Sequence, residues 1–169
     1  AGMAALIRDT TRVVYTESPG SHTFEVQDVP AIARAAHARG AKVLMDNTWG
    51  TPLFFKPFQH GVDMSIQAAT KYIVGHSDAM LGTVTCTKAV WPRLKQTSRD
   101  LGQTAGPDDV YLALRGIRTM GVRLQQPTQA ELLRAVDSRL GLDPQVRQMC
   151  HLLRHRGNEA AHQADHAIG

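Results

Sequence analysis

The chain has 169 residues, of which 43% are hydrophobic and 20% are charged, and these proportions are typical of one soluble globular domain. No apolar run approaches the roughly 20 residues that a membrane-spanning helix needs, so we expect no membrane partner. The formal net charge of +4 would permit binding to nucleic acid, but the arginines are scattered and aromatic residues make up only 5%. We therefore expect no nucleic-acid partner either.

The cysteines indicate a reducing environment. The chain has two, Cys86 and Cys150, and they form no CxxC pair. Such sparse cysteine usage is typical of proteins that keep their thiols reduced. The N-terminus also lacks the basic and then apolar layout of a signal peptide. Together these features predict a cytoplasmic location.

The first third of the chain has the pattern of a strand, a helix and a second strand. The segment RVVYTESPGS (12–21) opens with a short β-branched and aromatic run. DVPAIARAAHARG (28–40) is typical of a helix, with Asp28 as its N-cap. AKVLMDN (41–47) is nearly all apolar, as in strands buried on both faces of a parallel sheet. The pattern predicts a βαβ unit.

Two more strands and two more helices are expected after this unit. Short strands fit DMSIQAA (63–69) and MLGTVTCT (80–87), and a helix fits KAVWPRLKQTSRDLG (88–102). A longer helix fits residues 107–126, in which four apolar residues give the helical periodicity: Val110, Leu114, Ile117 and Val122. Beyond residue 125 the chain is polar and rich in Arg and His, and its pattern weakens. The elements predict the α/β fold class.

Polar residues follow two of the predicted strands. Asp46 closes KVLMD, and Thr70 and Lys71 follow SIQAA. Ligands of open α/β sheets bind outside the carboxyl ends of the strands, where these side chains are expected. Pyridoxal phosphate needs a lysine to form a Schiff base and a carboxylate to keep its pyridine nitrogen protonated. A lysine, a carboxylate and a neighbouring hydroxyl for the phosphate match this need together.

Three stretches carry a resemblance to a known family: residues 17–32, 43–84 and 112–124. The cofactor-lysine motif of that family is matched at seven positions, which are Asp63, Thr70, Lys71, Tyr72, Gly75, His76 and Ser77. On these residues the sequence resembles the Cys/Met-metabolism family of pyridoxal-phosphate-dependent enzymes, and most of all its cystathionine β-lyase branch.

The resemblance implies a role for five residues. Lys71 is implied as the Schiff-base and catalytic lysine, and Asp46 as the partner of the pyridine nitrogen. Thr70 resembles the family's phosphate ligand, and Thr48 resembles the residue that packs against one face of the ring. Ser21 lies where γ-acting members carry asparagine. The implied cofactor is pyridoxal 5'-phosphate, and no metal is expected.

The resemblance also implies an architecture. Residues 1–115 are expected to be part of the large, mostly parallel-sheet domain of a fold type I enzyme, with three αβα layers. Residues 116–169 are expected to hold a connecting helix and a poorly matching start of the C-terminal region. The resemblance covers much less than half of a family subunit, so we expect the chain to be a fragment that is inactive alone. The full-length family form is expected to be a homo-oligomer.

The branch depends on few residues. Trp49 and Ala68 resemble β-lyases, which implies β-elimination on cystathionine to homocysteine, pyruvate and ammonia. The alternatives are another transsulfuration enzyme of the family, a cystathionine γ-synthase or γ-lyase, and a non-catalytic fragment. In each case the implied substrate is a small sulfur amino acid.

The C-terminal tail offers a rival interpretation. His151 and His155, and likewise His162 and His166, are spaced i, i+4, as zinc ligands on a helix are. No HExxH motif is present, and exposed histidines explain the pattern more simply. A metal-binding or nucleic-acid-binding module remains the alternative of a different class.

Overall fold

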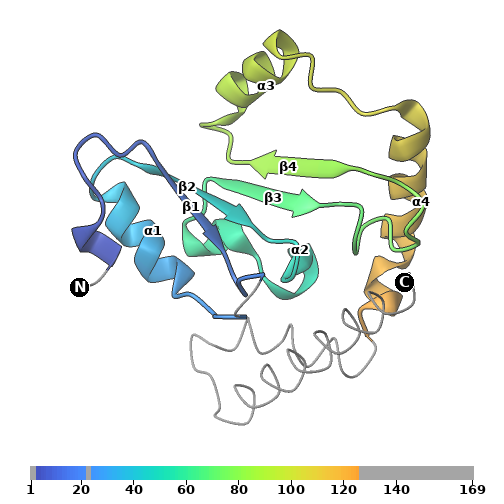
Figure 1. Ribbon diagram of the computed structural model, residues 1–169, viewed down its shortest axis with the longest axis horizontal. Coiled ribbons are helices and arrows are strands. Elements are labelled where there is room, and N and C mark those ends of the chain that lie inside the picture. The colour runs from blue at the N-terminus through green and yellow to red at the C-terminus, as the bar shows by residue number, and fades with distance from the viewer. Residues whose placement is uncertain (1–2, 22–23, 126–169) are drawn as a thin grey trace, which may run out of the picture.

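The computed structural model describes residues 3–21 and 24–125, which form a four-stranded sheet with helices around it (Figure 1). The strands lie in the order β1 (Val13–Glu17), β2 (Lys42–Asp46), β3 (Met64–Ala68) and β4 (Gly82–Cys86). β1, β2 and β3 are parallel, and β4 is antiparallel to β3. The predicted α/β class with a mostly parallel sheet is confirmed, and each predicted strand is present.

The described residues also contain three α-helices of nine residues or more. They are α1 (Val29–His37), α3 (Trp91–Asp100) and α4 (Pro107–Arg123), and all three were predicted. Short helical turns that the sequence pattern did not predict are η1 (Met3–Ala5), α2 (Thr51–Phe54) and η2 (Pro57–His60). The Asp28 carboxylate accepts a hydrogen bond of 2.9 Å from the Ala31 N–H, so the predicted N-cap of α1 is confirmed.

One face of the sheet packs against α1. Val14, Val43 and Met45 point to this face and form a core with Val29 and Ala36 of the helix. The opposite face of the sheet is less covered, because Val13 and Tyr15 of β1 and Val84 of β4 lie on it and are about half exposed. Asp46 alternates with Met45 along β2, so its side chain belongs to this opposite face.

The helix α4 is present as predicted, but the apolar residues whose spacing predicted it do not form its buried face. The four residues that gave the helical periodicity are 40% to 72% exposed: Val110, Leu114, Ile117 and Val122. The buried residues are instead Ala113, Gly116 and Met120, which pack on Ile73 and Val74 just after β3. Small side chains allow a closer approach of the two backbones than large ones. The domain boundary predicted at residue 115 lies inside this continuous helix and stays a prediction.

At the amino end of β3, Asp63 joins this strand to β2. The buried carboxylate accepts hydrogen bonds from the Val43 N–H at 2.9 Å, Lys42 Nζ at 2.9 Å and His37 Nε2 at 2.8 Å. Burial acts to raise the pKa of Asp63, but the hydrogen bonds from Lys42, Val43 and His37 lower it more, so the net pKa lies below its ordinary value. The matched family position at residue 63 is therefore structural.

The Asp63 carboxylate makes the free energy of unfolding depend on pH in the acidic range. Its pKa is lower in the folded than in the unfolded chain, so its contribution is complete above the unfolded value of about 3.9 and is lost as the pH falls through the folded value. We expect Asp63→Asn to lower the free energy of unfolding at pH 7 by about 1–3 kcal/mol, because the buried Val43 N–H and the partly exposed Lys42 and His37 side chains lose their charged acceptor. Urea unfolding between pH 7 and pH 2 measures this, and the variant should show a shallower loss below about pH 4.

Asp9→Asn is the matched control, because the Asp9 side chain is 93% exposed and its ion pair with Arg39 lies at the surface. An Asp63→Asn profile that runs parallel to the wild-type profile at all pH values would show that this carboxylate has no part in the acid dependence.

Candidate functional site

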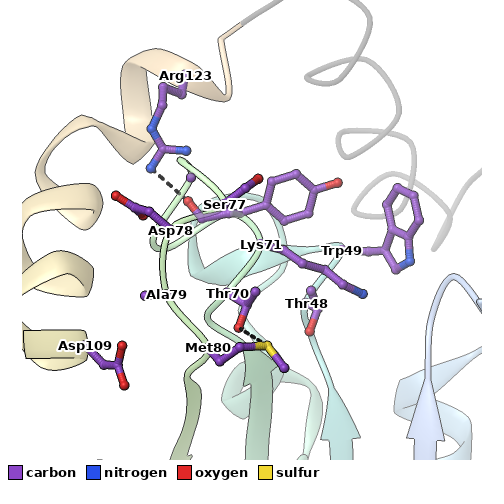
Figure 2. A pocket seen from close by; sticks show the side chains of 12 residues that line it. Thr48, Trp49, Thr70, Lys71, Ser77, Asp78, Ala79, Met80, Asp109 and Arg123 are labelled. Carbon is purple, nitrogen blue, oxygen red and sulfur yellow. Dashed lines mark hydrogen bonds between the residues drawn. The ribbon is translucent and has the colours of Figure 1, made fainter. Parts of the chain in front are cut away.

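A cavity of about 940 Å³ opens at the carboxyl ends of β2 and β3 (Figure 2). Thr48 and Trp49 come to its wall from the segment after β2, and residues between 70 and 80 come from the turn and loop after β3. Asp109 and Arg123 of α4 complete the wall. The structure therefore brings three predicted site residues, Thr48, Thr70 and Lys71, to one cavity, at the predicted edge of the sheet.

The Lys71 side chain is exposed in this cavity and extends toward the side on which Thr48 and Trp49 lie (Figure 2). Within the described residues its amine has no hydrogen bond or ion pair. The backbone of Lys71 is firmly held, because its N–H donates to the Ala68 carbonyl at 3.0 Å and its carbonyl accepts from the Gly75 N–H at 2.8 Å. A free amine on a fixed backbone is available for covalent chemistry.

Thr70 links the turn to the start of β4. Its hydroxyl accepts a hydrogen bond of 2.9 Å from the Leu81 N–H and donates to the Leu81 carbonyl over 3.3 Å. The backbone N–H of Thr70 also donates a hydrogen bond of 3.0 Å to the Leu81 carbonyl. The hydroxyl proton can therefore turn toward an anion in the cavity without leaving the Leu81 carbonyl unpaired.

Asp46 and Thr48 tie the end of β2 to the end of β3. The Asp46 carboxylate accepts from the Thr48 N–H at 2.8 Å, and the Thr48 hydroxyl accepts from the Ala68 N–H at 2.8 Å. Asp46 does not line the cavity itself, but Thr48 beside it does. The strand register places Asp46 and Tyr15 on one face of the sheet. Burial raises the pKa of Tyr15, and the negative charges of Asp46 and Glu17 add to this shift.

Ser21, like Asp46, does not line the cavity. It is exposed in the segment after β1, and its hydroxyl is hydrogen-bonded to the Glu17 carboxylate. One residue of that segment does contact the cavity wall, since the Phe24 ring packs on Trp49 at 5.4 Å, and Trp49 in turn packs on Tyr72 at 6.4 Å between centroids. The role of Ser21 stays a prediction.

Three charged residues of the cavity wall were not predicted: Asp78, Asp109 and Arg123. Asp78 is paired with Arg115 of α4 at 3.1 Å, so this carboxylate helps to hold the helix against the loop. Arg123 lies in the last turn of α4, and a basic residue there is ordinary on helix-dipole grounds. No sequence signal separates Arg123 from other basic residues, because its contacts depend on how α4 packs.

The described part of the chain fits a phosphorylated aldehyde cofactor in three respects. It has an unpaired amine, an adjacent hydroxyl whose proton can be redirected, and a carboxylate fixed on the neighbouring strand. Among residues 3–21 and 24–125, no group of three or more His, Cys, Asp or Glu side chains is placed to hold a metal ion. The histidine pairs of the tail lie outside the described residues. No helix in the described ranges has the length and apolar character for a membrane crossing.

A lysine at the carboxyl edge of a mostly parallel α/β sheet, with a carboxylate on the adjacent strand, is an arrangement expected of the class of pyridoxal-phosphate-dependent enzymes. Residues 1–168 match the model of one family in that class, and the chain belongs to this family, the Cys/Met metabolism PLP-dependent enzymes.

The relatives of this chain include several cystathionine lyases. It is 54% identical over 132 residues to a putative cystathionine β-lyase of Rhizobium johnstonii, covering 78% of this chain and 33% of that protein. It is 44% identical over 147 residues to the cystathionine β-lyase MetC of Escherichia coli, covering 86% and 37%. A cystathionine γ-lyase of Dictyostelium discoideum is 38% identical over 118 residues, covering 69% and 30%.

A solved structure has the same fold. The cystathionine γ-lyase of Lactobacillus plantarum, complexed with L-serine, matches with a TM-score of 0.70 and 32% identity over 78% of this chain and 34% of that one. This likeness confirms the predicted fold type I architecture. The chain spans about one third of the length of the curated relatives it matches.

Proposed function

We propose that this chain contributes the cofactor-binding segment of a pyridoxal-phosphate-dependent carbon–sulfur lyase. The proposed reaction is β-elimination on cystathionine, which consumes water and gives homocysteine, pyruvate and ammonia. The observation that carries the proposal is the free Lys71 amine, which shares a cavity with Thr70 and lies at the same sheet edge as Asp46. The names of the relatives at 40% to 54% identity support it.

Each residue of this set has a proposed role. Lys71 would hold the cofactor through its aldehyde group, and the Lys71 amine would act as the base that removes the proton from the substrate Cα. Thr70 donates its hydroxyl proton to the phosphate, and the Thr48 side chain packs against the ring. Asp46 keeps the ring nitrogen protonated. The bound cofactor supplies an electron sink for the carbanion at Cα.

The choice of products tests the proposed function. A full-length protein that carries this segment should convert cystathionine to homocysteine and pyruvate. The support is Trp49, whose ring lines the cavity between Phe24 and Tyr72, together with the several β-lyases among the relatives. A coupled assay for 2-oxo acids, with thiol products separated by chromatography, measures the outcome. Dominant cysteine and 2-oxobutyrate would instead favour the γ-lyase alternative.

Asp46→Asn should leave the fold intact but lower turnover of cystathionine by about 10²-fold or more. This is the lower end of the effect expected when an enzyme loses a side chain that controls protonation at the reacting centre. The amide keeps an oxygen acceptor for the Thr48 N–H, so the turn after β2 is preserved. The neutral side chain no longer stabilises a protonated ring nitrogen. Steady-state kinetics of the full-length protein measure the loss, which should fall on kcat more than on cofactor affinity.

Asp108→Asn, an exposed carboxylate in the first turn of α4, is the matched control and should leave the rate near that of the wild type. Near-normal β-elimination by Asp46→Asn would remove this carboxylate from the proposed mechanism.

The proposed full-length enzyme is a cytoplasmic homo-oligomer. The exposed face of α4 supports self-association, because large exposed apolar patches mark interaction surfaces. The apolar side chains on that helix that are 40% or more exposed are Val110, Tyr111, Leu114, Ile117 and Val122.

A further inference from the structure

The turn that carries Lys71 satisfies only part of its own backbone. The Lys71 N–H donates to the Ala68 carbonyl at 3.0 Å, the Val74 N–H to the Ala69 carbonyl at 2.8 Å, and the Gly75 N–H to the Lys71 carbonyl at 2.8 Å. The carbonyls of the two residues that follow Lys71 take no part in these bonds. A partner from outside the turn can therefore help to fix this side of it.

Arg123 is that partner. Its Nη2 donates to the carbonyls of Tyr72 at 2.8 Å and Ile73 at 3.3 Å, and also to the Gly116 carbonyl at 2.9 Å. Its Nε donates to the Thr119 hydroxyl at 3.0 Å. The guanidinium is thus held on its own helix and reaches across to the two residues directly after Lys71. The planar guanidinium makes both sets of contacts at once, with Nη2 on the carbonyls and Nε on the Thr119 hydroxyl, whereas a lysine would have to make them from a single charged nitrogen.

Two glycines make room for this contact. A Cβ at Gly75, whose φ is +75°, would lie 2.2 Å from Arg123 Nη1, so a side chain there would displace the guanidinium. A Cβ at Gly116 would lie 2.4 Å from the Ile73 carbonyl oxygen, so α4 approaches the turn more closely than any other residue would permit. Both glycines and Arg123 therefore allow α4 to pack with its backbone against the backbone of the turn after β3. We call this contact the junction.

We propose that Arg123 is a positioning residue for Lys71. By holding the carbonyls of Tyr72 and Ile73, it fixes the turn that directs the Lys71 amine into the cavity. The meaning of this for catalysis rests on the proposed function, in which Lys71 binds the cofactor. The mechanical part, a turn held by a guanidinium, does not depend on any cofactor.

Hydrogen exchange of the 169-residue chain tests the mechanical part. In Arg123→Met, the Val74 and Gly75 amides should exchange on the order of tenfold faster, as expected for the loss of a charged hydrogen bond. The amides of β1 and β2 should keep their wild-type rates. Arg118→Met removes the same charge from an exposed position of the same helix and should change neither set. Arg123→Lys, the milder variant, should accelerate the same two amides by a smaller factor.

The link to Lys71 has a second readout. The full-length protein and its variants are incubated with pyridoxal phosphate, reduced with borohydride and mapped, well below their unfolding temperatures. Arg123→Met should lower the share of label on Lys71 relative to Lys42, Lys56 and Lys88, and Arg118→Met should not. A purely structural role would lower the melting temperature without changing how the label divides among the lysines.

The two failures are distinguishable. Wild-type exchange rates at Val74 and Gly75 in Arg123→Met, or an equal acceleration in Arg118→Met, would overturn the positioning role whatever the labelling shows. An unchanged share of label on Lys71 in Arg123→Met would break the link between the junction and the lysine. A wild-type protein without preferential label on Lys71 would contradict the proposed function itself, and Arg123 would then have no cofactor lysine to position.

Discussion

In the full-length protein, Lys71→Ala should lower the rate of β-elimination from cystathionine by at least about 10²- to 10⁴-fold, the range that a positioned general base supplies. The substitution also removes the amine proposed to bind the cofactor, so the loss should not fall below this range. The fold should survive, because the Lys71 side chain is exposed and forms no hydrogen bond within the described residues. Pyruvate release measures the rate, and thermal unfolding by circular dichroism checks the fold.

Lys88→Ala is the control for this experiment, because Lys88 is exposed in the loop after β4 and does not line the cavity. It should keep both the rate and the melting temperature. A Lys71→Ala protein that retains a tenth or more of the wild-type rate would show that another group performs the proposed chemistry.

Gly116→Ala should destabilise the chain, although alanine is the better helix former. A Cβ at this position would lie 2.3 Å from the Val74 carbonyl oxygen and 2.4 Å from the Ile73 carbonyl oxygen. These are backbone atoms of the turn after Lys71, so they cannot rotate away as a side chain would. Overpacking costs about 1–3 kcal/mol, and we expect the upper end of this range, which exceeds the gain in helix propensity of about 1 kcal/mol.

Gly121 provides a matched control on the same helix. A Cβ there meets nothing within 4 Å, so Gly121→Ala should stabilise the chain by up to about 1 kcal/mol through helix propensity alone. Urea unfolding of both variants measures the opposite signs. Equal stabilisation by the two substitutions would show that α4 does not depend on close contact with the turn.

Sequence patterns predicted most of this fold because they depend on local chemistry. The apolar run 41–47 and the capped helix from Asp28 each carry their signal within a few residues, and both elements are present. The edge at which Asp46 and Lys71 lie also followed from the pattern, since parallel strands end at one edge of a sheet. Local periodicity and sheet direction are sufficient for these features.

The features that local patterns missed depend on packing between distant segments. The large apolar residues whose spacing predicted α4 do not form its buried face, because at Gly116 the turn after β3 leaves no room for a side chain. The contacts of Arg123 join residues 50 and 51 positions apart. Ser21 follows a strand that ends at the same edge, but its segment carries it to the surface rather than to the cavity. The hydrophobic period of one segment contains no information on these contacts.

The central claim is that Lys71 is the residue that binds the cofactor. Borohydride reduction of the full-length protein after incubation with pyridoxal phosphate, followed by peptide mapping with mass spectrometry, tests it most directly. We expect one dominant pyridoxyl label on Lys71, the lysine whose free amine lines the cavity next to the Thr70 hydroxyl. A dominant label on Lys42, Lys56 or Lys88 would contradict it.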